Sequence, residues 1–335
     1  MTDVATDPGA EAPVAASGAR GLRLGFVGGR LIRLAVSLVV LVTATFAMIH
    51  LVPGDPVAAA LGEMASPEVV AKRKHELGLD LPIIEQYFRY LGGLLRGDLG
   101  TSITTHEPVS RVIAQRLPNS LALALPAFVV ILVVAVTLGM AVAVRTFNRP
   151  ARVTDTVFTG VTGVLNSVPE FAVATGLVAV FAVGLRALPV SGNNGPAAYV
   201  LPVASLAIGS IATLSRIARA ETVKVLRSDY LRTARGRRLH PARLYLRHVL
   251  PNMMTSSLTY GGLLLSGLVA GTVIVENIFS WPGLGTQISQ AVVGKDYALI
   301  QGIVLVLGLL VLCINLAVDV LLVLLDPRLR VRAGA

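Results

Sequence analysis

The chain has 335 residues, of which 54% are apolar and only 14% are charged, and its mean hydropathy is +0.73. Soluble globular domains carry about 25% charged residues, so the composition indicates a polytopic membrane protein. The net charge of +10 does not indicate nucleic-acid binding, because the basic residues lie mainly between apolar runs. Cys313 is the single cysteine, which excludes an internal disulfide and a cysteine-based metal site.

The first segment, residues 1–30, is rich in alanine, glycine and small polar residues and contains Pro8 and Pro13. It has no apolar period that could form a core, so we expect a disordered cytoplasmic tail. The apolar run that follows starts too late for a cleaved signal peptide. We expect residues 31–330 to form one membrane domain, followed by a short tail at 331–335.

Charge-free runs locate the membrane spans, because about 20 apolar residues cross a hydrocarbon core about 30 Å thick. A sixth region, 156–185, is interrupted only by Glu170, and we expect a break in it at Ser167-Val168-Pro169-Glu170. The sequence thus predicts an all-α protein with six transmembrane helices. The five charge-free spans are 34–54, 117–144, 187–215, 248–275 and 297–318.

Basic residues indicate the orientation. With the N-terminus inside, 20 of the 29 lysine and arginine residues fall in cytoplasmic segments. Cytoplasmic loops carry such an excess, so we expect both termini in the cytoplasm.

Two segments between spans are longer than ordinary loops. The outside loop 55–116 contains a helical pattern from Ser66 to Leu77 that begins with Ser-Pro-Glu, a combination typical of a helix start; we expect it to form a cap. The inside loop 216–251 carries ten basic residues, and its apolar residues are spaced so that they can form a stripe on a docking helix. The stripe comprises Leu231, Ala234, Leu239 and Leu246.

The sequence lacks the residue patterns that several kinds of catalytic or metal site require. A phosphate-binding loop needs Gly-x-x-x-x-Gly-Lys-Ser/Thr, and the nearest string, Gly294-Lys295-Asp296, lacks the first glycine and the hydroxyl. The five histidines are scattered without zinc-site spacing. A membrane-embedded serine hydrolase needs a serine and a base at one depth, and only Ser256 near His248 approaches this arrangement.

Polar residues inside spans are candidate functional groups. Glu170 follows a proline at mid-span, where broken helices often line a cavity, so a pathway role and a structural role are equally open. Glu276 fits the outer boundary of its span. Asn315 and Asp319 fit hydrogen bonds across helices or to a basic residue, and a structural role is favoured for Asp319.

The cytoplasmic loop resembles a known pattern. It reads Asp229-Tyr230-Leu231-Arg232-Thr233-Ala234 and then Arg247-His248-x-Leu250-Pro251-Asn252. This is similar to the EAA loop through which permeases of bacterial ABC importers contact their ATPases, in the form used by the dipeptide, oligopeptide and nickel branch. We call residues 229–251 the coupling segment.

Further strings resemble the same branch in the same order, over about residues 31–330. They are Pro53-Gly54-Asp55-Pro56, Leu77-Gly78-Leu79-Asp80-x-Pro82, Gly97-Asp98-Leu99-Gly100-x-Ser102, Ser167-x-Pro169-x-Phe171, Leu188-Pro189-x-x-Gly192, Glu276-x-Ile278-Phe279-x-x-Pro282-Gly283-Leu284-Gly285, Asn315-Leu316-x-Val318-Asp319 and Asp326-Pro327-Arg328-x-Arg330. The long 55–116 loop resembles the first of the two permease types of this branch.

The loop departs from the family pattern at one position. The family usually has glycine four residues after the alanine, whereas this chain has Arg238 and places its glycine at Gly236. Glycine gives a turn its backbone freedom, so we expect the bend to shift or to be taken up by Leu239-His240-Pro241.

The resemblance implies a type I ABC-importer permease that imports peptides and binds no cofactor itself, while ATP and Mg²⁺ bind partner ATPases. It implies as partners a second homologous permease, two ATPase subunits, an extracytoplasmic substrate-binding protein and the lipid of a bacterial inner membrane, without nucleic acid and without a metal site. The coupling candidates are Asp229, Tyr230, Arg232, Thr233, Ala234, Gly236, Arg238, Arg247, His248, Leu250 and Pro251. The pathway or gate candidates are Ser167, Pro169, Glu170, Glu276, Phe279, Pro282, Gly283, Asn315 and Asp319.

Import of nickel or another small solute by the same architecture is the alternative substrate assignment. A secondary carrier or a membrane-embedded hydrolase is the alternative class. Loss of ATPase chains from the purified protein would favour that class.

Overall fold

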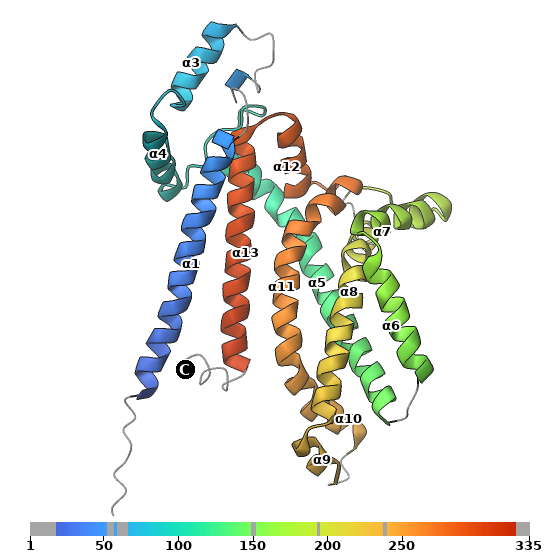
Figure 1. Ribbon diagram of the computed structural model, residues 1–335. Helices are drawn as coiled ribbons and strands as arrows, with labels where there is room; N and C mark the ends of the chain where they lie inside the picture. The colour runs from blue at the N-terminus through green and yellow to red at the C-terminus, as the bar shows by residue number, and fades with distance from the viewer. Residues whose placement is uncertain are drawn as a thin grey trace, which may run out of the picture.

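The computed structural model describes residues 18–51, 57–58, 66–148, 152–192, 195–236 and 240–325. Within these ranges the chain is helical, and its only bridge of the β type joins Thr101 and Pro108. Figure 1 shows long helices running side by side, with short helices gathered at both ends. The predicted all-α architecture is confirmed.

The long helices overlap the predicted spans, although the span predicted at 187–215 begins only at Ala197. Four single helices are long and apolar enough to cross a membrane: α1 (Gly18–Leu51), α5 (Val109–Asn148), α8 (Ala197–Leu226) and α13 (Tyr297–Leu325). Two bent stretches bring the number in the described part of the chain to six if each is one span. They are α6 (Arg152–Ser167) with α7 (Glu170–Leu177) and the π-helix η1 (Val178–Gly184), and α11 (Leu250–Ile278).

The N-terminal prediction needs a correction. Helix α1 begins at Gly18, so residues 18–30 are not part of a disordered tail; residues 1–17 lie outside the described residues. Alanine and small polar residues dominate the first 17 positions, whereas the next segment contains long apolar side chains that favour a helix. These are Leu22, Leu24, Phe26 and Val27.

Helices α5 and α8 form the centre of the bundle, where they pack against each other extensively. The buried cluster around them includes Leu123, Ile131, Leu214 and Trp281. Gly139 permits the close approach of the two helices, because a Cβ at this position would overlap the backbone of Ser215. Helix α1 packs chiefly on α13.

The loop between α1 and α5 carries α3 (Pro67–Leu77) and α4 (Ile83–Leu95). The helix predicted from Ser66 to Leu77 forms, and Ser66 is its N-cap. Gly78 ends α3 in the left-handed region with φ of +67°, which glycine adopts without steric cost. Helix α4 is joined to α1 by a hydrogen bond of 3.0 Å between the Thr43 and Tyr87 hydroxyls.

The two long insertions lie at opposite ends of the bundle. Figure 1 shows α3, α4 and α12 (Leu284–Val293) at one end, and α9 (Asp229–Gly236) and α10 (Pro241–Leu244) at the other. We call these the cap end and the coupling end. The strings at 53–56 and 326–330 and the tail 331–335 lie outside the described residues.

Candidate functional site

The coupling segment folds as short helices that follow α8. Helix α9 ends at Gly236, and α10 begins at Pro241 with His240 as its N-cap. The chain then passes through the π-helix η2 (Tyr245–Val249) into α11. The two short helices are thus separated by residues 237–240, of which 237–239, including Arg238 and Leu239, lie outside the described residues.

One side of the coupling segment is buried in this chain. Leu231, Leu244 and Val249 form a cluster with Leu226 at the end of α8. Ala234 and Tyr245 pack against this cluster together with Val144 and Phe147 from α5. The segment is therefore anchored to both central helices.

The predicted docking stripe is wrong in this respect. Leu231 is fully buried and Ala234 packs beside it, whereas Leu246 is 59% exposed. Leu231, Ala234 and Leu246 therefore do not form one outward stripe, and Leu239, the fourth predicted member, lies outside the described residues.

Polar contacts hold the segment in place. The Asn148 amide donates to the Tyr245 hydroxyl at 3.1 Å, which joins the end of α5 to η2. The Tyr230 hydroxyl donates to the His248 carbonyl at 3.3 Å. The guanidinium of Arg235 lies 4.7 Å from the ring centre of Phe147, within cation–π distance.

The opposite side of the segment is exposed. Its exposed members are Asp229, Tyr230, Arg232, Thr233, Gly236, Leu246, Arg247 and Pro251, while His248 and Leu250 are partly buried. An anchored segment with an exposed basic and apolar side has the build of a docking element.

Glu170 lies where two helix breaks meet. The predicted break is present: α6 and the stretch from Glu170 to Gly184 meet at 94°. Pro169 is the N-cap of α7, and the Ser167 hydroxyl donates to the Gly163 carbonyl at 2.9 Å. Glu170 faces Gly271, next to the 47° bend of α11.

The Glu170 carboxylate has an unusual environment. Its Oε1 atom is buried and has no hydrogen-bond partner among the described residues. A buried carboxylate oxygen without a partner is costly, so the arrangement makes Glu170 a candidate functional group at the helix break.

Glu276 caps a helix. Its Oε2 accepts hydrogen bonds from the backbone N–H of Gly285 at 2.6 Å and of Thr286 at 3.3 Å. Gly283, the N-cap residue of α12, has no side chain for this purpose. The Glu276 carboxylate therefore supplies the oxygen that the first turn of α12 needs.

The turn between α11 and α12 leaves no room for a side chain at two of its glycines. A Cβ at Gly283 would overlap the Glu276 carboxylate, and a Cβ at Gly285 would overlap the backbone of Val273. The hydroxyl of Ser120 on α5 accepts the Leu284 N–H at 2.8 Å. The string from Glu276 to Gly285 thus locks α11, α12 and α5 together.

The rest of this turn belongs to the core. Phe279 and Trp281 are buried, and the Phe279 carbonyl accepts the Gly192 N–H at 3.1 Å. Trp281 donates from Nε1 to the Asn119 carbonyl at 2.9 Å and meets Tyr199 of α8 edge to face. The Pro282 carbonyl accepts from the Asn119 amide at 2.9 Å.

Asn315 and Asp319 have partners within the chain. Asn315 Oδ1 accepts from the Ser266 hydroxyl at 3.0 Å, which joins α13 to α11. Asp319 forms an ion pair of 3.0 Å with Arg30 of α1. These contacts agree with the structural interpretation of both residues.

Sequence reasoning missed Asp296. Its Oδ2 accepts from the Ser102 hydroxyl, and from the backbone and hydroxyl of Thr104 at 3.1 and 2.8 Å. Its Oδ1 accepts the Leu299 N–H at the start of α13. Burial raises the pKa of Asp296, but these hydrogen bonds outweigh burial and hold the pKa below its usual value of 3.8. An aspartate directly before an apolar span was the signal that could have revealed this cap.

Comparison with known proteins gives a consistent result. A family described as binding-protein-dependent transport system inner membrane component matches residues 135–331, and the N-terminal component of the same transport systems matches residues 23–124. The inward-facing structure of the methionine ABC transporter MetNI has a TM-score of 0.54 at 15% identity, covering 64% of this chain and 96% of that one. This likeness supports the fold.

Curated relatives are similar over nearly the whole chain. The glutathione transport system permease protein GsiC of Salmonella paratyphi A is 36% identical over 307 residues, which cover 92% of this chain and 99% of that protein. A Brucella abortus protein, provisionally named a peptide transport system permease protein, is 37% identical over 295 residues, which cover 85% of this chain and 92% of that protein. With its apolar helices, this multi-pass membrane chain belongs to the binding-protein-dependent transport system inner membrane components, as an ABC-importer permease of the peptide and nickel branch.

Proposed function

We propose that this permease forms the path by which peptides enter a bacterial cell across the inner membrane. The family to which it belongs works with ATPase and substrate-binding components. The peptide assignment is supported by the names of its relatives, which refer to glutathione and to peptides. We propose as its partners a second homologous permease, two ATPase subunits that bind ATP and Mg²⁺, and an extracytoplasmic binding protein. Both termini of this chain lie in the cytoplasm in this proposal.

The anchored coupling segment carries this proposal. Leu231, Leu244 and Val249 fix it to the ends of α5 and α8, so a force applied to its exposed side is transmitted to the central helices. Closure of two ATPase subunits around ATP would move this segment and change the packing of the bundle. ATP hydrolysis then belongs to the partners, and this chain supplies the mechanical connection.

The extracytoplasmic binding protein acts from the cap end on the equilibrium between the inward-open and outward-open states of the bundle. A binding protein that docks more tightly on the outward-open state favours that state in proportion to its difference in affinity. The loop 55–116 and residues 277–296 are the proposed docking surface. Their described helices, α3, α4 and α12, lie at the cap end (Figure 1).

The path itself is proposed to pass the break between α6 and α7. Ser167, Pro169 and Glu170 lie at this break, and Glu170 brings a partnerless carboxylate oxygen to it. Broken helices within a membrane are tolerated where they line a cavity or are covered by protein. Selectivity among peptides is left largely to the binding protein.

Reconstituted transport tests the proposal. The complex is placed in vesicles, and uptake of labelled glutathione, a labelled tripeptide and Ni²⁺ is measured with and without ATP, together with ATP hydrolysis. Leu246→Asp tests the coupling segment, because this side chain is 59% exposed. Leu246→Met is the matched control.

We expect ATP-dependent peptide uptake, which Leu246→Asp abolishes and Leu246→Met preserves. Uptake of Ni²⁺ but not of peptides would replace the substrate assignment. Normal uptake by Leu246→Asp would overturn the coupling role of this surface. Uptake without any ATPase subunit would identify a secondary carrier.

A further inference from the structure

Two hollows follow one another between α5, α6 and α8, toward the coupling end. The first is an apolar groove of about 460 Å³. Its lining includes Leu138 and Val142 of α5, and Val157, Val161 and Leu165 of α6. The three α6 residues are exposed, so the groove opens on the outside of this chain.

The second hollow is a basic pocket of about 250 Å³. Three arginines line it: Arg152 at the start of α6, Arg219 on α8, and Arg227 at the C-cap of α8. Asp155 is the single acidic residue in the lining. The pocket thus carries a surplus of two positive charges.

The groove and the pocket are continuous along two helices. On α5, Val142 of the groove is followed four residues later by Thr146 of the pocket, and on α8 Ser215 is followed by Arg219. Residues four apart lie one above the other on the same helix face. One elongated molecule can therefore occupy both hollows, with an apolar part in the groove and an anionic part among the arginines.

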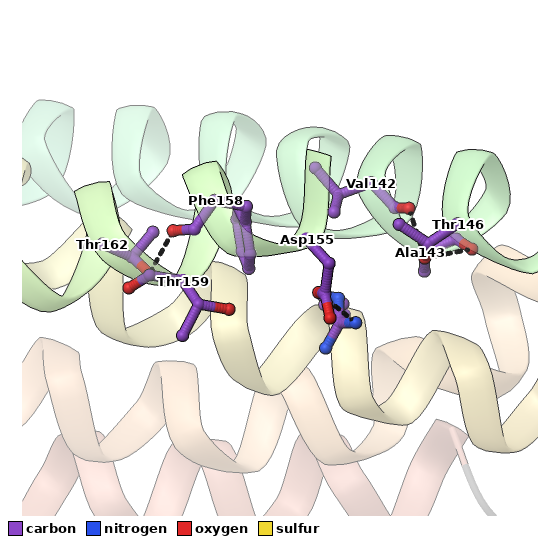
Figure 2. Close-up of polar contacts among 8 residues, drawn as sticks. Val142, Ala143, Thr146, Asp155, Phe158, Thr159 and Thr162 are labelled. Atoms are coloured by element: carbon purple, nitrogen blue, oxygen red, sulfur yellow. Dashed lines mark hydrogen bonds and ion pairs between the residues drawn. The ribbon is translucent and has the colours of Figure 1, made fainter. Parts of the chain in front are cut away.

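The ion pair in the pocket leaves donors available. Asp155 Oδ1 lies 2.5 Å from Arg219 Nη2, and Figure 2 shows Asp155 directed from α6 toward α8. Arg219 Nε is buried and has no hydrogen-bond partner among the described residues. Asp155 therefore orients Arg219 without using its full set of five N–H donors. The exposed side chains of Arg152 and Arg227 stand beside it.

The groove is mainly apolar, and three hydroxyl residues line it: Thr154, Thr162 and Ser215. The Thr162 hydroxyl donates to the Phe158 carbonyl at 2.7 Å, as drawn in Figure 2, and the Ser215 hydroxyl donates to the Ala212 carbonyl at 3.1 Å. Two of the three hydroxyl hydrogens are therefore used within their own helices. Most of the remaining lining is apolar, which suits an acyl chain.

We propose that this site binds an anionic phospholipid, with its phosphate at Arg152, Arg219 and Arg227 and one acyl chain in the groove. Basic pockets between helices at the cytoplasmic surface are suited to anionic headgroups. The apolar run of α5 ends just before Arg145, which places the pocket near the level of the headgroups. The site shares Phe147 with the anchor of the coupling segment.

Lipid retention by the intact complex tests this proposal. The complex is reconstituted in vesicles of phosphatidylcholine mixed with phosphatidylglycerol and extracted in mild detergent, and the retained lipids are measured by native mass spectrometry. The headgroup variant is Arg152→Gln with Arg227→Gln. The control with the same charge change is Arg145→Gln with Arg216→Gln, two exposed arginines that do not line the pocket.

We expect retained phosphatidylglycerol to exceed its share in the vesicle. An arginine that faces the lipid phosphate contributes about 1 kcal/mol, or about fivefold in preference for anionic lipid, so loss of the two pocket arginines should lower the enrichment about 25-fold at this site. The control pair should keep it. Equal enrichment in the two double variants, or none in the unchanged protein, would overturn the site.

A photoreactive side chain at Val161 identifies the occupant of the groove. Val161 is 52% exposed and lines the groove. Labelling of phospholipid in the assembled complex is the expected result. Labelling of another protein subunit instead would assign the groove to a subunit interface and refute the lipid site. Neither measurement depends on transport, so the lipid site is tested separately from the proposed peptide substrate.

Discussion

The carboxylate of Glu276 at the end of α11 lies 2.6 Å from the backbone nitrogen of Gly285 in the first turn of α12. One helix thereby caps the next across a sharp turn, and the turn is fixed to α5 through Ser120. This contact explains why the string from Glu276 to Gly285 contains a carboxylate and closely spaced glycines. It gives these residues a structural role that does not require contact with a substrate.

Gly285→Ala should destabilise the complex. The added methyl group would overlap the backbone of Val273, and overpacking of this kind costs about 1–3 kcal/mol. Thermal unfolding of the detergent-solubilised complex measures the effect. Gly267→Ala is the control, because a Cβ at that α11 glycine meets nothing within 4 Å; equal unfolding temperatures for both variants would contradict the tight turn.

Asp296→Asn should loosen the loop that precedes α5. The aspartate accepts hydrogen bonds from Ser102 and Thr104, and bonds to a charged group contribute about 1.5–3 kcal/mol each. Hydrogen exchange of residues 101–105 should therefore be faster in the variant. Exchange at the wild-type rate would show that the carboxylate charge does not hold this loop.

The same contact should depend on pH. The pKa of Asp296 is lower in the folded protein than its usual value of 3.8, so the unfolded chain binds its proton first as pH falls. The stabilisation is complete above the usual pKa and is lost as pH falls through the lowered value. Proteins are usually most stable at about pH 5 to 8, and protection of residues 101–105 from hydrogen exchange should persist over this range. It should decline only in stronger acid. The Asp296→Asn variant should lack this acid-dependent loss of protection.

Glu170→Gln tests the path at the helix break. Removing a carboxylate from within a span removes a cost of about 2.5–3.5 kcal/mol, so the complex should assemble and be at least as stable as the wild type. If Glu170 lines the path, uptake should fall about tenfold, equivalent to about 1.4 kcal/mol. Glu221→Gln on α8 is the control, because Glu221 lies outside the helix break and the proposed docking surfaces and its pair with Lys224 is 3.9 Å long. Wild-type uptake at every substrate concentration would return Glu170 to a structural role.

Asp319→Asn should have a small effect. Its ion pair with Arg30 joins α1 to α13 at partly exposed side chains, and such pairs contribute about 0–1 kcal/mol. Uptake should stay close to wild type, and exchanging the two residues, Arg30→Asp with Asp319→Arg, should restore any lost stability. Abolished uptake at unchanged stability would instead place Asp319 in the transport path.

Much of the architecture could be predicted from the sequence, because transmembrane spans depend on one-dimensional properties. The charge-free runs and the proline before Glu170 located the long helices and the break. The serine, proline and glutamate at residues 66–68 located α3, because capping depends on neighbours in the chain.

The contacts that fix the candidate sites could not be predicted in this way. Ser102 and Asp296 are 194 residues apart in the sequence, and nothing local pairs them. The spacing of Leu231 and Leu246 suggested one stripe, but the break after Gly236 gives them different surroundings. Composition likewise misassigned residues 18–30, because the apolar residues from Leu22 to Val27 extend the helix of the apolar run that follows.

Helix α8 has 30 residues, so at 1.5 Å per residue it is about 45 Å long. Near one end Tyr199 meets Trp281 of the cap-end turn, and at the other end Leu226 joins the anchor of the coupling segment. A rod held at both ends cannot tilt at one end alone. Helix α8 therefore links the coupling segment to the cap-end turn as one continuous element, and between these two ends it crosses Gly139 of α5 closely at Ser215.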